Sequence, residues 1–98
     1  MNVAEQIIAT GYLLIKRGWC QGCSYDGERI CLARALAIVT NTVDSIEFPL
    51  RETDIFKYLS QRLHYKYLSD WNDQVATCLD DVILMLSRAA DDWRKEHS

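Results

Sequence analysis

Apolar side chains recur every three or four residues in a segment at each end of the chain. The N-terminal stripe consists of Val3, Ile7, Ile8, Leu14 and Ile15, with Gly11 among them. The C-terminal stripe consists of Leu79, Val82, Ile83, Leu86, Ala90 and Trp93. This spacing is typical of amphipathic helices, and it predicts helices over residues 2–17 and 78–95.

Residues at the ends of these two segments support the prediction. Asn2 and Glu5 have the spacing of a capping box, and so do Thr77 and Asp80. Gly18 suits the left-handed stop of the first helix. Within that helix a glycine at position 11 costs about 1 kcal/mol relative to alanine. We expect the close approach of another helix to compensate for this cost.

The middle of the chain predicts two more helices. After Arg29, the segment 29–40 has Arg34 as the single polar residue before its last position, and its alanines favour a helix over a strand. A helix that is apolar nearly all round should be central. The segment 52–66 carries a stripe that includes Phe56 and Leu59.

The two remaining segments, 18–28 and 67–77, are predicted to be loops. The first contains three of the four glycines, and the second gathers Ser, Asn and Asp around Trp71. The predicted fold is therefore all-α, a compact four-helix single domain over residues 1–98. In an antiparallel bundle the first and third connections lie at the same end. Trp19 and Trp71 should thus lie together, near the start of the last helix.

Composition narrows the classes of partner. The net charge is −3 and the eleven Lys and Arg residues are scattered, which argues against an extended nucleic-acid footprint. No apolar run approaches the roughly 18 residues of a membrane span. The N-terminal segment carries Glu5 and no cationic lead, so we expect no secretory signal. These features predict a soluble cytoplasmic protein whose thiols stay reduced.

Four landmarks follow one another along the chain: Arg17-Gly18-Trp19, Ile30 to Leu36, Trp71-Asn72-Asp73, and Thr77 ahead of Asp80-Asp81. In this combination the chain resembles an uncharacterised family of small helical proteins from bacteria and bacteriophages that is marked by a Trp-Asn-Asp motif. The resemblance implies an α-helical domain and brings no settled activity. It also implies that a cysteine like Cys31 is common, whereas a pair like Cys20 and Cys23 is not.

The four cysteines allow three interpretations. Cys20, Cys23, Cys31 and Cys78 could supply four thiolates to a tetrahedral zinc ion, but Cys31 and Cys78 form no second CxxC knuckle. A thioredoxin-like role is disfavoured, because that motif opens a helix after a strand, whereas here a turn follows. The favoured interpretation is that the CxxC segment turns a corner, with no metal and no cofactor.

Trp71-Asn72-Asp73 also allows two interpretations. Asn and Asp side chains can fix an irregular loop by hydrogen bonds to backbone groups, with Trp71 as the apolar anchor. Alternatively, Asn72 and Asp73 line a small-ligand pocket together with Trp19, Tyr25 and Arg17. The sequence leaves both open.

The functional prediction follows from what the chain lacks. Neither His64 nor His97 belongs to a recognisable nucleophile–base motif, and no phosphate-binding glycine loop is present, so we expect no enzyme. We expect a non-enzymatic interaction module, a phage or mobile-element accessory protein that binds and modulates a host protein, possibly one of host defence. The alternative is a protein that binds or sequesters a nucleotide-like ligand through the Trp19 and Trp71 loops. The oligomeric state is not predicted.

Overall fold

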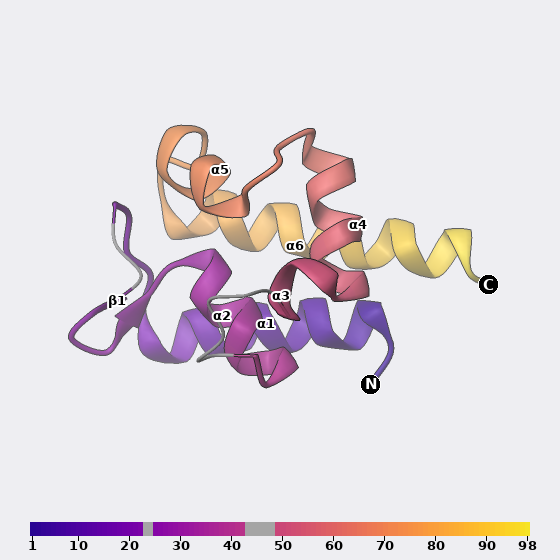
Figure 1. Cartoon of the computed structure of the whole chain (residues 1–98), viewed down its shortest axis with the longest axis horizontal. Helices are drawn as coiled ribbons and strands as arrows, with labels where there is room; N and C mark the ends of the chain where they lie inside the picture. Colours follow the sequence, from indigo (N-terminus) through magenta and orange to yellow (C-terminus); the bar gives the residue numbers. More distant parts are fainter. Residues whose placement is uncertain (23–24, 43–48) are drawn as a thin grey trace.

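Helices form most of the computed structural model, which describes residues 1–22, 25–42 and 49–98 (Figure 1). In chain order the elements are α1 (Val3–Arg17), β1 (Tyr25–Asp26), β2 (Arg29–Ile30), α2 (Leu32–Thr40), α3 (Pro49–Glu52), α4 (Asp54–Leu63), α5 (Leu68–Gln74) and α6 (Leu79–Glu96). The mostly helical, single-domain fold agrees with the prediction. The number of helices and the strictly all-α class do not, because the described ranges hold six helices and a small two-stranded sheet.

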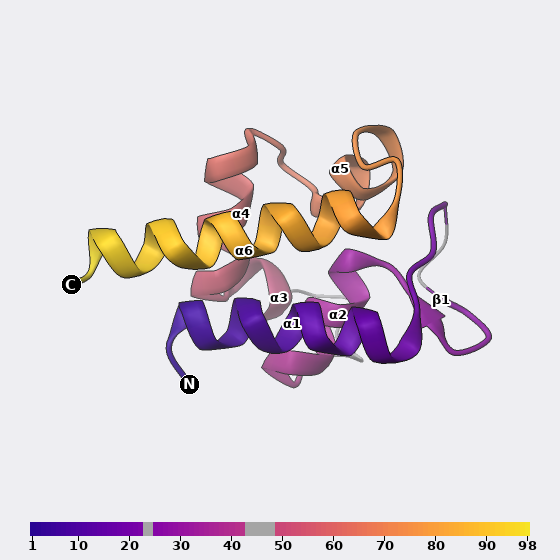
Figure 2. The ribbon, with the colours of Figure 1, turned by 180° about the vertical axis from the view of Figure 1, so that it is seen from behind.

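The longest helices, α1 and α6, lie side by side and antiparallel, with the remaining helices behind them (Figure 2). The start of α1 and the end of α6 are therefore at the same end of the molecule. The contact between α1 and α6 is the most extensive between any two elements, followed by that between α1 and α2. A continuous apolar core joins residues of α1, α2, α4, α5 and α6. No helix of the described ranges is both long and apolar enough to cross a membrane.

The predicted start and end of α1 are confirmed. The Asn2 side chain accepts from the Glu5 backbone N–H at 2.8 Å, and the Glu5 carboxylate accepts from the Asn2 N–H at 2.9 Å. At the other end Gly18 has a φ of 90° and donates to the Leu14 carbonyl at 2.8 Å. Thr10 faces the core, where its hydroxyl donates to the Gln6 carbonyl.

The helix predicted from residue 29 begins three residues later, at Leu32. Arg29 and Ile30 pair instead with Asp26 and Tyr25 across a two-residue turn at Gly27, which has a φ of 64°. The segment predicted as a loop thus contains a short hairpin, too brief to leave an alternating pattern in the sequence. The expectation that this helix is central holds, since its side chains at positions 32, 35 and 36 are fully buried.

The helix predicted over 52–66 is shorter in the structure, where α4 covers Asp54–Leu63 and a separate short helix, α3 (Pro49–Glu52), precedes it. The Thr53 hydroxyl donates to the Leu50 carbonyl at 2.6 Å, and it accepts from the Phe56 N–H at 3.3 Å. Thr53 therefore ends one helix and caps the next. The α4 helix stops at His64, which adopts a left-handed conformation with a φ of 60°.

The prediction of a loop over 67–77 was wrong, because residues 68–74 form α5. Leu68, Trp71 and Asn72 are three and four positions apart, and all three are buried. The polar residues between them are on the exposed side of the helix. A helix of only about two turns with a buried asparagine resembles an irregular segment when only apolar residues are counted.

The second capping box was also predicted wrongly. Cys78 is the N-cap residue of α6 and makes no capping hydrogen bond with its side chain. The carboxylate of Asp81, not that of Asp80, accepts from Thr77, at 2.8 Å from the backbone N–H and 2.6 Å from the hydroxyl. These hydrogen bonds, the hydroxyl first, lower the pKa of Asp81.

Gly11 lies against α6, but the two helices do not approach closely enough to require a glycine. A methyl group at Gly11 would lie 3.7 Å from Ile83 Cδ1 and 3.8 Å from Leu86 Cδ1, which are ordinary van der Waals distances. At Gly18, by contrast, it would lie 2.8 Å from Arg29 Cγ and at a positive φ.

We therefore predict that Gly11→Ala stabilises the protein by about 1 kcal/mol and raises its Tm by about 4–8 °C. Gly18→Ala is the matched control and should lower the Tm, because of the clash with Arg29 and the positive φ. Thermal unfolding followed by circular dichroism measures both. A lower Tm for Gly11→Ala would mean that α1 and α6 pack more tightly than described.

Candidate functional site

The two segments predicted to meet do meet at one end of the molecule. The Trp19 indole N–H donates to Asn72 Oδ1 at 2.6 Å, and the Gly22 N–H donates to Asp73 Oδ1 at 2.8 Å. The Gln21 side chain reaches the Ala76 carbonyl at 2.6 Å, close to the start of α6. The prediction that the Trp19 and Trp71 segments share an end is confirmed.

Asn72 is the centre of this contact. Its side chain is fully buried and uses both amide atoms twice. The Oδ1 atom accepts from the Trp19 indole and from the Leu32 N–H at 3.0 Å. The Nδ2 group donates to the Cys20 carbonyl at 3.1 Å and to Asp73 Oδ1 at 2.9 Å. One amide thus joins the segment after α1, the start of α2 and α5.

Neighbouring side chains extend the contact, and we call the set Trp19, Gln21, Asn72 and Asp73 the amide latch. The Gln21 amide also donates to the Asn72 carbonyl at 3.0 Å. Asp73 accepts from both the Gly22 backbone and the Asn72 side chain through one oxygen. Every buried side-chain N or O atom in the described residues has a partner. The buried polar side-chain atoms of the latch are therefore satisfied by partners within the chain.

The other predicted site residues lie apart from the centre of the latch. The Trp71 side chain packs into the core and is 7% exposed. Tyr25 is 62% exposed on β1, where its ring faces the Arg34 guanidinium at 5.5 Å. Arg17 donates to the Glu28 carbonyl at 3.0 Å and so supports the hairpin.

The cysteines of the zinc interpretation are distributed between the core and the surface. Cys20 and Cys31 are buried and Cys78 is exposed, while Cys23 lies outside the described residues. Cys31 is the N-cap of α2, and its sulfur accepts from the Arg34 N–H at 3.4 Å. Burial raises the pKa of the Cys31 thiol. Across the described part of the chain, no three His, Cys, Asp or Glu side chains form a group that could hold a metal ion.

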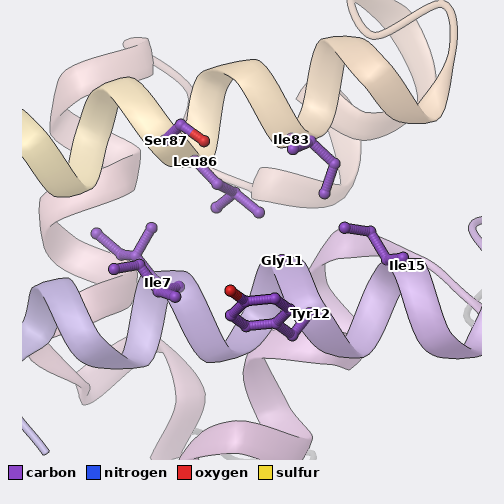
Figure 3. A pocket seen from close by; sticks show the side chains of 8 residues that line it. Ile7, Gly11, Tyr12, Ile15, Ile83, Leu86 and Ser87 are labelled. Atoms are coloured by element: carbon purple, nitrogen blue, oxygen red, sulfur yellow. The ribbon is translucent and has the colours of Figure 1, made fainter.

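A groove between α1 and α6 was not predicted from the sequence (Figure 3). It has a volume of about 220 Å³ and is lined by Ile7, Ile8, Gly11, Tyr12, Ile15, Ile83, Leu86 and Ser87. Tyr12 and Ile15 are 70% and 58% exposed on its rim. Gly11 lies between the two helices and leaves the floor of the groove open.

Ile15 is part of the apolar stripe predicted for α1, yet 58% of it is exposed. Ile8, Tyr12 and Ile15 follow one another at steps of four and three, so they extend the apolar side of the helix beyond the part that α6 covers. The width of the apolar side of this helix, rather than its period, is the feature of the sequence that could have indicated the groove.

The lining of the groove is mostly apolar. Tyr12 and Ser87 contribute the polar side-chain atoms of its lining, and in both residues this atom belongs to a hydroxyl group. The remaining side chains are aliphatic, and the Gly11 position has none. This arrangement suits an apolar side chain from another molecule better than it suits a reaction that moves protons.

The chain belongs to a family of unknown function, DUF6197, whose family model matches residues 1–92. No curated protein and no solved structure matches the chain. Membership agrees with the resemblance to an uncharacterised family and assigns no activity to the latch or to the groove.

Replacing Asn72 with alanine should lower the free energy of unfolding by about 3 kcal/mol, because it leaves buried partners such as the Leu32 N–H without an acceptor. Asp73→Ala should cost about 1 kcal/mol, since Asp73 is exposed and accepts two hydrogen bonds. Urea unfolding measures both. An unchanged stability for Asp73→Ala, combined with loss of binding to a partner, would instead make Asp73 a binding residue.

We also predict that the fold does not depend on a metal. A chelator should leave the circular-dichroism melt unchanged, because the apolar core and the latch involve no metal ligand. Elemental analysis should find far less than one zinc ion per chain. Stoichiometric zinc whose removal melts the helices would restore the zinc interpretation of Cys20 and Cys23.

Proposed function

We propose that the protein is a non-enzymatic module that binds another protein chain through the outward face of α1 and α6. The observation that carries this proposal is the α1–α6 groove with its exposed rim. Tyr12 and Ile15 remain largely in water, and Ile8 and Ile83 beside them are partly exposed. An apolar groove with an aromatic rim is a common feature of protein-binding sites.

The energetics support a protein partner. Burying a large apolar side chain completely contributes roughly 1.5–3 kcal/mol. Tyr12 and Ile15 together offer a substantial part of such a gain, and tyrosine is enriched among the residues that dominate binding energies. Helices hold both residues in place, so the cost of ordering them on binding is small.

The biological setting remains part of this proposal. The resemblance to small proteins of bacteria and phages supports a cytoplasmic accessory protein of a phage or mobile element, which binds and modulates a host protein. A position of the gene among defence or counter-defence genes would support this setting.

The alternative, a nucleotide-like ligand held between the Trp19 and Trp71 segments, stays a prediction. The Trp19 indole N–H and both atoms of the Asn72 amide already bond within the chain. A ligand that used these groups would first have to break the latch. We therefore do not put it forward as a second function.

Photo-crosslinking in bacterial cells tests the proposal. A benzophenone amino acid replaces Tyr12 on the groove, and in a matched variant it replaces Tyr25, which is a similarly exposed tyrosine on the hairpin. Irradiation at position 12 should give discrete protein adducts at several times the yield seen at position 25. Mass spectrometry then identifies the captured chain.

Two crosslinking results would contradict the proposal. If position 12 gives no protein adduct, or gives the same adducts as position 25, the outward face of α1 and α6 is not a protein-binding surface. Circular dichroism of both variants excludes unfolding as the cause.

A further inference from the structure

We propose that the chain bound at this face is a second copy of the protein, stacked face to face on the first. This inference rests on the proposed function, because it takes the outward face of α1 and α6 to be a protein-binding surface. Three properties of the face support it, namely its shape, its charges and its size.

The shape of the face is self-complementary. Tyr12 and Ile15 project from it, while Gly11 and Ser87 leave a depression between the helices (Figure 3). A two-fold dimer requires one patch to supply both the projection and the depression. The same face of one chain does so here.

The charged residues around the face alternate in sign along each helix and between the two helices. On α1, Glu5 and Lys16 are seven positions before and four positions after Tyr12, so they share its side of the helix. On α6, Asp80 and Arg94 are each seven positions from Ser87. All four charged residues are exposed.

Because α1 and α6 are antiparallel, each end of the face carries one acid and one base. Glu5 and Arg94 lie at one end, and Lys16 and Asp80 lie at the other (Figures 1 and 2). Turning a second copy over onto this pattern places every charge opposite one of the other sign. This is true for a two-fold axis that runs along the helices and for one that runs across them. Face-to-face stacking is therefore electrostatically favoured.

The other exposed charges do not disturb the pattern. Arg88 and Asp91 lie one turn apart near the middle of α6, where their opposite charges offset each other. Lys95 and Glu96 directly follow Arg94, and their opposite charges offset each other at that end of the face.

The size of the face sets the strength of the dimer. Helices of 15 and 18 residues are about 22 and 27 Å long, and two of them side by side cover a flat area of roughly 450 Å². This is less than the ~800 Å² per partner of a standard interface, so we expect a weak dimer with a Kd in the micromolar range.

Sedimentation of the purified protein over a concentration series tests the inference. The wild type should change from monomer to dimer at micromolar concentration. D80K should weaken the dimer about tenfold, because it turns two attractive pairs into repulsive ones. Tyr12→Ala should weaken it further, whereas Tyr25→Ala, the matched control on the hairpin, should have no effect.

Mixing two charge variants shows whether D80K weakens the dimer by disrupting an ion pair between chains or by changing its own helix. If the two-fold axis runs across the helices, Asp80 faces Arg94 of the second copy, and mixing D80K with R94E restores the dimer. If the axis runs along the helices, Asp80 faces Lys16 of the second copy, and mixing D80K with K16E restores it. Restoration by either partner supports the inference and identifies the axis.

Two results would overturn the inference. One is a wild-type protein that stays monomeric at the highest attainable concentration, and the other is a lack of restoration in both mixtures. If position 12 nevertheless crosslinks to a different protein, the proposed function stands and only the second copy is excluded. Melting curves of D80K, R94E and K16E establish that each variant is folded.

Discussion

The buried amide of Asn72 is the interaction on which the arrangement of the chain depends. Three of its four hydrogen bonds connect α5 to the segment that follows α1 and to the first turn of α2, and the fourth is to its neighbour Asp73. Leaving such a group unpaired in the core is costly, so the three segments are stable only together. The amide therefore fixes the end of the molecule from which α6 starts, and α6 extends from there along α1.

Local signals explain which elements could be predicted from the sequence. Both α1 and α6 have long apolar stripes, and α1 has a capping box, so their bounds were predicted to within one residue. The hairpin and α5 were missed because each is too short for its period to show. In α5, moreover, a buried position is filled by an asparagine whose partners are about 40 or more residues away. Only the folded chain brings these partners together.

The candidate site, too, could be predicted from the sequence only in part. Topology alone predicted that the Trp19 and Trp71 segments meet, since connections alternate between the ends of an antiparallel bundle. It could not show that Asn72 would use all its polar atoms within the chain. The α1–α6 groove escaped prediction for a different reason. Ile15 continues a helical stripe, and the period does not reveal how much of that stripe a single neighbouring helix covers.

Gly11 affects both the stability of α1 and the depth of the groove on the outward face of α1 and α6. A glycine within a helix is less stable than alanine, and the distances to Ile83 and Leu86 leave room for a methyl group. Packing inside the chain therefore does not require the glycine, and its cost is not offset there. What the missing side chain provides is a deeper groove beside Tyr12 and Ser87. The residue at position 11 is thus better explained by what enters the groove from outside than by the contact between α1 and α6.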